Sequence, residues 1–202
     1  SVLDKYQYLP KQDRAFMTGL VDGTIEYMLQ LDYIIDSFSK TKVKKMKPFI
    51  RNLLRMSVYQ IKYMDAVPDS AVCNEAVKLA KRHKFAQLSG FVNGVLRNVA
   101  RNIDSVELDT LSIRYSMPQW IVDRFVAAYG SEKAEEIFKA FHSKSAISIR
   151  TNLTRCTPDE LRTMLEAEGV TVAPVDELNY AFVISGFDYL NGLHSFRDGL
   201  FY

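Results

Sequence analysis

The chain has 202 residues, of which 48% are hydrophobic and 25% charged, and its formal net charge at pH 7 is +2. This is enough apolar material for one or two domains with buried cores. No apolar run approaches the length of a membrane span, and two cysteines do not make a disulfide framework. We therefore expect a soluble cytoplasmic protein, or a piece of one, that has no membrane partner.

The first long segment, Asp13 to Ile35, has the spacing of a helix. Gly19 and Gly23 lie one turn apart within it and cost about 1 kcal/mol each relative to Ala, which predicts either close helix packing or a break between two helices. The apolar residues that we expect on its buried side are Phe16, Leu20, Val21, Met28, Leu31, Ile34 and Ile35.

Three further helices are predicted between Pro48 and Arg101. Pro48 suits a first helical turn, where its missing N–H costs nothing. The stretch 67–70 (Val-Pro-Asp-Ser) breaks the pattern, because a residue before proline is disfavoured in the α region and Asp or Ser can cap the next helix. Apolar residues recur at helical spacing on each side of this break.

The charge is distributed unevenly along the chain. Residues 40–101 carry 14 Lys and Arg against three Asp and Glu, whereas the rest of the chain carries 12 against 21. A basic region of this kind attracts polyanions, of which RNA is the commonest large one in a cell, although it can also be a solvated face that balances the acidic remainder. The candidate phosphate-binding residues are Lys42, Lys44, Lys45, Lys47, Arg51, Arg55, Lys78, Lys81, Arg82, Arg97 and Arg101.

After Arg101 the sequence becomes polar and acidic over 102–109, which suggests a domain boundary. Two helices are expected next, one from Ser116 to Gly130 and one over 132–142. Trp120 is the single tryptophan, and we expect it to anchor the core at the junction of the two halves, with base stacking as the less favoured alternative.

From Ala146 the apolar period changes from helical to alternating. Residues 146–153, 170–173 and 181–184 are predicted as strands. Between them, Thr157 to Glu160 form a capping box with proline at the first helical position, and Gly169 is a suitable end for that helix. Residues 200–202 have the pattern of a strand that has just begun.

Catalytic and metal-binding patterns are not found. Cys73 lies on an apolar helix face and Cys156 precedes a helix cap, so both are expected to be buried bystanders rather than nucleophiles. The three histidines are far apart and show no ligand spacing, so we expect no metal site. The nine glycines are scattered rather than gathered in a cofactor-binding loop.

The basic region resembles a known family. PFIRNLLRMSVYQIKYMDAVPDSAVCNEAVKLAK and the following GFVNGVLRNVAR are similar to the NusB-type helical domain at the front of bacterial Sun/RsmB proteins, which are ribosomal RNA cytosine-C5 methyltransferases. DRAFMTGLVDGTIEYMLQLDYII fits the preceding helices of that domain, and SMPQWIVDRF, IRTN and FRDGLFY fit the region before the methyltransferase core.

The resemblance implies a mainly α fold, a NusB-like helical bundle followed by a small α/β (α+β) module. We expect a NusB-like RNA-binding domain at 1–103, a helical linker at 104–145 and the small module at 146–202, ahead of a methyltransferase domain that would begin after Tyr202. The family's opening helix would be clipped here, which leaves an exposed apolar patch. S-adenosylmethionine and the catalytic cysteines would belong to the parent enzyme, with no cofactor in this chain.

Three functional hypotheses follow from the residues and the resemblance together. In the first, the chain binds small-subunit ribosomal RNA, with phosphates held by the basic faces and selectivity supplied by Arg150 and Asn152 in the α/β module. In the second, it is a NusB-like antitermination or protein-interaction module that binds a ribosomal protein. In the third, it braces the catalytic half of the parent enzyme. We favour the first hypothesis.

Overall fold

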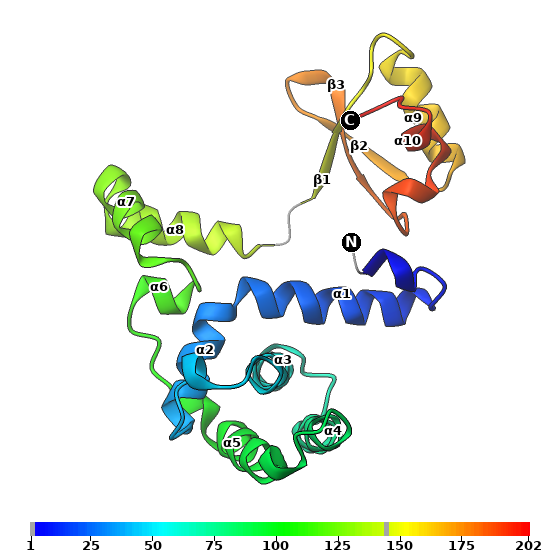
Figure 1. The fold of residues 1–202 in the computed structure, drawn as a ribbon. Coiled ribbons are helices and arrows are strands. Elements are labelled where there is room, and N and C mark those ends of the chain that lie inside the picture. The colour runs from blue at the N-terminus through cyan, green and yellow to red at the C-terminus, as the bar shows by residue number, and fades with distance from the viewer. Residues whose placement is uncertain (1–2, 144–145) are drawn as a thin grey trace. The chain divides into compact units, whose positions relative to one another are not determined.

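The computed structural model describes residues 3–143 and 146–202. The chain divides into two compact units, Ser1–His142 and Ser143–Tyr202 (Figure 1). The first unit is built of helices and the second combines helices with a small sheet, as the resemblance implied. The three-part division predicted from the sequence stays a prediction.

The first unit contains eight α-helices among its described residues and four short 3-10 helices. The α-helices are α1 (Lys11–Glu26), α2 (Met28–Phe38), α3 (Pro48–Tyr63), α4 (Asp69–Arg82), α5 (Ser89–Asn102), α6 (Leu111–Arg114), α7 (Gln119–Tyr129) and α8 (Ser131–Phe141). The 3-10 helices are Leu3–Tyr6, Val43–Lys45, Ala86–Leu88 and Ile103–Ser105.

Helices α2 to α5 enclose the main core of this unit. Their apolar faces meet in one cluster in which Leu31, Leu54 and Leu96 are completely buried. Pro48 is the first residue of α3, as the sequence predicted. The break predicted at 67–70 lies at 64–68, because α3 ends at Tyr63 and α4 begins at Asp69. No side chain of Asp69 or Ser70 caps α4, whose N-cap position is Pro68.

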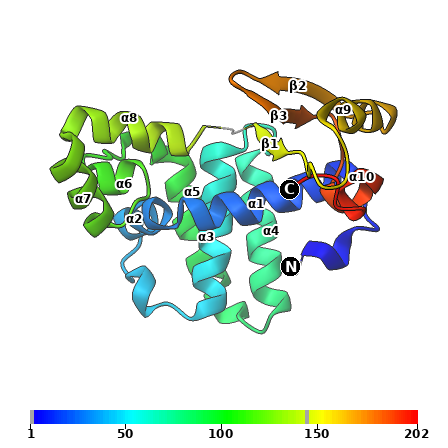
Figure 2. The same ribbon diagram turned by 90° about the horizontal axis from the view of Figure 1, so that it is seen from above.

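The segment Asp13 to Ile35 forms two helices rather than one, because α1 ends at Glu26 and α2 begins at Met28. Helix α1 crosses α3 at a steep angle (Figure 2). Gly23 lies at this crossing, where a Cβ would be 2.5 Å from Cε2 of Tyr59, and Gly19 faces open space. One glycine of the predicted pair therefore allows close packing and the other does not.

Three residues that we expected in the core are substantially exposed. Phe16, Val21 and Met28 are 41%, 36% and 37% accessible, whereas Leu20, Leu31, Ile34 and Ile35 are buried. The prediction was wrong for Phe16 and Val21 because they lie on the side of α1 that is not covered, and for Met28 because it is the first residue of α2. The result is an apolar patch on α1, as the resemblance suggested.

Trp120 is not a core anchor, because it is 67% exposed. Helices α7 and α8 pack around Val122, Ala134 and Phe138. Trp120 precedes Val122 by two residues, which places it about 200° away around the helix, on the opposite face. Val122 is therefore buried between α7 and α8, and Trp120 remains exposed to solvent.

The helices after Arg101 are tied to the bundle by a buried polar contact. The side chain of Gln30, which is 1% exposed, donates to the carbonyl oxygens of Ile113 (3.2 Å) and Arg114 (2.8 Å). The hydroxyl of Ser116 accepts a hydrogen bond from the backbone N–H of Leu29 at 3.1 Å. These bonds hold α6 and the residues after it against the start of α2.

The second unit is a three-stranded antiparallel sheet with two helices. The elements are β1 (Ile147–Arg150), α9 (Pro158–Ala167), β2 (Thr171–Val175), β3 (Leu178–Ser185), the 3-10 helix Leu190–Gly192 and α10 (His194–Arg197), and the strand order is β1-β3-β2. Residues 147–150 pair with 181–184, which places Ile149 opposite Phe182 in the core.

The strands and the helix predicted between residues 146 and 184 begin and end within three residues of those in the structure. Thr157 and Glu160 form the capping box at the start of α9, and Gly169 after that helix has φ +80°. The end of the chain returns to β1, where Arg150 and Tyr202 exchange backbone hydrogen bonds of 3.0 and 2.9 Å. The beginning of a strand predicted at 200–202 is present as this short pairing.

Candidate nucleic-acid interface

The basic loop before α3 is held in a defined conformation by its own apolar residues. Val43 and Met46 are buried in the bundle core, and the carboxylate of Asp36 accepts a 2.7 Å hydrogen bond from the N–H of Val43. Because these residues point inward, the lysines between them are directed into solvent. We call the cations of this loop, Lys42, Lys44, Lys45 and Lys47, the lysine loop.

Most of the predicted basic residues are free to meet an anion. Within the described part of the chain, seven of them are exposed and form no ion pair with an acidic side chain: Lys44, Lys45, Lys47, Lys81, Arg82, Arg97 and Arg101. Arg97 has a neutral hydrogen-bond partner, because its Nε donates to Oδ1 of Asn93 at 3.0 Å.

Two other members of the predicted set are weakly paired at the surface. Lys42 Nζ lies 3.9 Å from Oδ2 of Asp36, and Lys78 Nζ lies 2.6 Å from Oε1 of Glu75. An exposed pair of this kind contributes about 0–1 kcal/mol, so a phosphate can compete for either lysine.

Arg55 has a different role from the one predicted. Its Nε and Nη2 donate to the two carboxylate oxygens of Asp32, each at 2.6 Å, and the arginine side chain is only 14% exposed. This two-pronged ion pair joins α3 to α2. Arg55 is therefore committed to the bundle and is removed from the candidate phosphate contacts.

Arg51 is intermediate between these cases. It is half-buried, and its Nε makes no hydrogen bond within the described chain. It lines a hollow with Val21, Met28 and Met56, so its surroundings are more apolar than those of the lysine loop. The basic face seen in the sequence is thus several separate environments in the fold.

The two candidate RNA-binding residues in the α/β module, Arg150 and Asn152, differ in exposure. Arg150 is exposed and stacks over the ring of Tyr180, 5.2 Å from its centroid. Asn152 is 7% exposed, its Nδ2 donates to the carbonyl of Gly199 at 2.8 Å, and its Oδ1 accepts from the hydroxyl of Thr154 at 2.7 Å. The amide of Asn152 is used inside the module, which favours a structural role, and its contact with RNA stays a prediction.

A hollow of about 350 Å³ lies beside the lysine loop. Ile50, Leu88 and Phe91 form its apolar lining, and Lys45 and Lys47 line it as well. Cations next to an apolar floor suit an unpaired nucleotide, whose base prefers apolar contact and whose phosphate prefers a cation. Sequence reasoning missed this juxtaposition because Leu88 and Phe91 are distant in the chain from the lysines.

Neither cysteine is disposed for nucleophilic chemistry. Cys73 and Cys156 are buried, and burial raises the pKa of each thiol. A raised pKa lowers the fraction of thiolate at neutral pH, which is the reactive form. Both thiols therefore fit the bystander role expected from the sequence.

Neither a metal-binding cluster nor a membrane-spanning helix is found in the described ranges. No group of three His, Cys, Asp or Glu residues there is arranged to hold an ion. No helix within those ranges is both long and apolar enough to cross a bilayer.

Two stretches of the chain are recognised by comparison with known protein families. Residues 1–101 match the NusB family, and residues 117–187 match the ferredoxin-like domain of Methyltr_RsmF/B-like proteins. The chain belongs to the NusB family over its first half. The pair of domains confirms the resemblance to the Sun/RsmB methyltransferases.

Relatives with both parts carry a common name. The chain is 34% identical to the probable ribosomal RNA small subunit methyltransferase B of Bacillus subtilis and 30% identical to that of Synechocystis, over 96% and 91% of its length. It spans 44% and 42% of those proteins. It is also 38% identical over 97 residues to the transcription antitermination protein NusB of Dictyoglomus thermophilum, of which it covers 67%.

A solved structure shares the fold. The crystal structure of PH0851 superposes on this chain with a TM-score of 0.75 at 17% sequence identity. The superposition covers 99% of this chain and 46% of the PH0851 chain. The order of helical unit and α/β unit is thus found in an experimentally determined protein.

Proposed function

We propose that this chain is the RNA-binding portion of a small-subunit ribosomal RNA cytosine-C5 methyltransferase and that the lysine loop and the ends of α4 and α5 hold the phosphates of 16S ribosomal RNA. The observation that carries the proposal is the group of seven exposed cations without acidic partners in the described chain. Methyl transfer, with S-adenosylmethionine as donor, is assigned to the parent protein.

In the absence of RNA these cations have no acidic side chain among the described residues to neutralise them. Lysines without a carboxylate partner keep a local positive field, and binding of a polyanion releases its condensed counterions. Contacts of this kind give affinity and orientation but carry little sequence information. The interface is therefore expected to bind several RNAs, with strong salt dependence.

The test is a salt series of RNA binding, measured by fluorescence anisotropy with a small-subunit ribosomal RNA fragment. The test variant is Lys44→Glu/Lys45→Glu/Lys47→Glu. The control variant is Lys11→Glu/Arg124→Glu/Lys139→Glu, which changes the net charge equally at exposed positions outside the proposed interface.

The test variant should bind more weakly, with a log–log salt slope smaller by about 2, since each phosphate contact contributes roughly 0.7 to 0.9. The control variant should keep nearly the whole slope. An equal loss in both variants would show a general effect of net charge, and the lysine loop would then have no special role.

A protein partner is the second candidate, and the exposed apolar patch on α1 favours it. Phe16, Val21 and Ile25 are 41%, 36% and 64% accessible. We include a ribosomal protein as the partner class because of the NusB match. Co-purification with a ribosomal protein after ribonuclease treatment, lost in Ile25→Glu, would support this candidate.

A further inference from the structure

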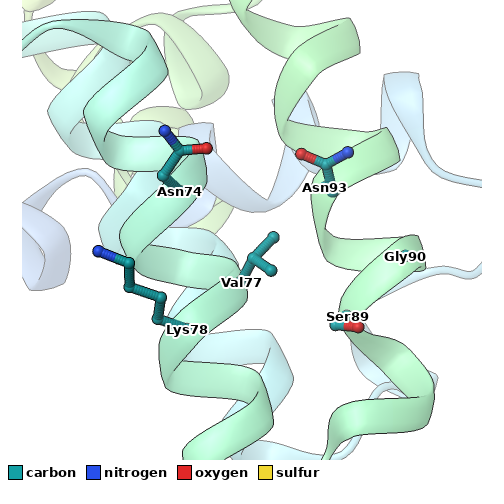
Figure 3. Close-up of a pocket in the computed structure, with 6 residues that line it drawn as sticks. All are labelled: Asn74, Val77, Lys78, Ser89, Gly90 and Asn93. Carbon is teal, nitrogen blue, oxygen red and sulfur yellow. The ribbon is translucent and has the colours of Figure 1, made fainter.

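A second hollow, of about 430 Å³, opens between α4 and α5 and differs in chemistry from the one beside the lysine loop. It is lined by Asn74, Val77 and Lys78 from α4 and by Ser89, Gly90 and Asn93 from α5. Figure 3 shows Asn74 and Asn93 on facing helices, with Val77 directed toward α5 between them. We call this hollow the amide groove.

The two carboxamides can each meet a ligand. Asn74 is exposed and its side chain forms no hydrogen bond with any described residue, so the donor and acceptor of its carboxamide are both open. Asn93 is half-buried, and its Oδ1 accepts from Arg97 Nε at 3.0 Å, which leaves its amide hydrogens available. The bond also places the guanidinium of Arg97 next to Asn93, a residue that lines the groove.

The groove stays open because one wall lacks a side chain. A Cβ at Gly90 would have no atom within 4 Å, so nothing in the described fold requires glycine there for packing. Above Gly90 the helix backbone can be approached closely by a flat ligand. Val77 provides an apolar surface at the same level.

We propose that the amide groove binds an unpaired nucleotide of RNA, with Asn74 and Asn93 hydrogen-bonded to the edge of its base and Arg97 or Lys78 near its phosphate. The two amides supply both donors and acceptors, as a base edge requires, and the flanking groups are cations. A helical RNA would not fit, because its base edges are already paired. This inference rests on the proposed function and adds base contact to a surface otherwise suited to phosphates.

The amide groove and the hollow beside the lysine loop lie on different faces of α5. Leu88 and Phe91 line the hollow beside the lysine loop, whereas Ser89, Gly90 and Asn93 line the amide groove. At about 100° per residue these two sets of side chains lie on roughly opposite sides of the helix. The amide groove is therefore a site separate from the lysine loop.

The experiment uses the full chain and two fluorescent RNA probes, a mixed-sequence single strand of about 12 nucleotides and a duplex of the same length. The groove is changed without altering charge, by Asn74→Ala and separately by Gly90→Gln, which places a side chain in the hollow. Gly19→Gln is the matched control, because Gly19 is also an exposed helical glycine with open space around it, on α1.

Loss of hydrogen bonds to one base should weaken single-strand binding about fivefold to tenfold in both groove variants. The salt slope should remain that of the unchanged chain, since no phosphate contact has been removed. The control variant and all affinities for the duplex should remain unchanged. Circular dichroism is expected to be the same for all variants, because both sites are open.

Two outcomes would overturn the inference, and they differ. If the unchanged chain binds neither probe, the proposed function fails and the groove proposal fails with it. If the unchanged chain binds the single strand and both groove variants bind it equally well, RNA binding stands and the amide groove is not the site of base contact.

Discussion

Replacement of Gly23 by alanine should destabilise the helical unit, although alanine is the better helix former. Gly23 lies in α1 at its crossing with α3, and an added Cβ would be 2.5 Å from Cε2 of Tyr59 and closer still to Cζ and the phenol oxygen. The tyrosine ring would have to move. It is held between Tyr27 and Tyr63, whose ring centroids lie 6.2 and 5.3 Å away.

The magnitude follows from two opposed effects. Overpacking against a held ring costs about 1–3 kcal/mol, and the gain in helix propensity returns up to about 1 kcal/mol. The expected net loss is about 1–2 kcal/mol. In a unit of this size each kcal/mol lowers the Tm by about 2–4 °C.

Gly19→Ala is the matched control, one turn earlier in the same helix. Its added Cβ has no atom within 4 Å, so this change should stabilise by about 0.5–1 kcal/mol. Thermal unfolding followed by circular dichroism at 222 nm measures both variants. In a Tyr59→Leu background the Gly23→Ala penalty should disappear, because the ring that opposes the Cβ is gone.

An equal, stabilising effect of both alanines would refute this reasoning. It would mean that the ring of Tyr59 moves aside at no cost and that α1 is not held against α3 by the close approach at Gly23.

Three further predictions concern groups that the fold binds internally. Asn152→Ala should destabilise the α/β unit by about 1–3 kcal/mol without changing RNA affinity, because it removes the amide bond to the carbonyl of residue 199; urea unfolding and anisotropy measure the two effects. Hydrogen bonds from the N–H and hydroxyl of Thr157 lower the pKa of Glu160 below 4.5, so their stabilisation is present above pH 4.5 and is lost as the pH falls through the lowered pKa; Glu160→Gln should flatten the acid limb of the stability–pH curve. Arg55→Ala and Asp32→Ala should each destabilise the helical unit by about 1–3 kcal/mol, and a double-mutant cycle should show coupling between them, whereas additive losses would contradict a paired role.

The helices and strands could be predicted because their signals are local. The proline at position 48, the proline at position 68 in the break before α4 and the capping box at Thr157 each act through the backbone of a few neighbouring residues. The apolar faces of α2 to α5 repeat at helical spacing whatever they pack against. The family resemblance extended this local reading to the order of the two units.

The candidate interface could be located from the sequence but not resolved into contacts. The excess of Lys and Arg over residues 40–101 is a property of composition, and it indicates a candidate surface for a polyanion. Composition cannot distinguish Arg55, which faces Asp32, from Lys45, which faces solvent, because the two partners of the ion pair are 23 residues apart. Asn74 and Asn93 were overlooked for the same reason, since the groove exists only when α4 and α5 lie side by side.

The sequence by itself determined most of the helices and strands, the uneven distribution of charge along the chain and the family. Only the tertiary structure decided which side chains are available: Trp120 is exposed, Asn152 is buried, and one glycine of a similar pair meets a ring while the other meets solvent. Helix and strand formation depends on neighbours along the chain, whereas burial and pairing depend on groups brought together from distant positions. For this reason the helices and strands could be predicted from the sequence, whereas the exposure and pairing of individual side chains could not.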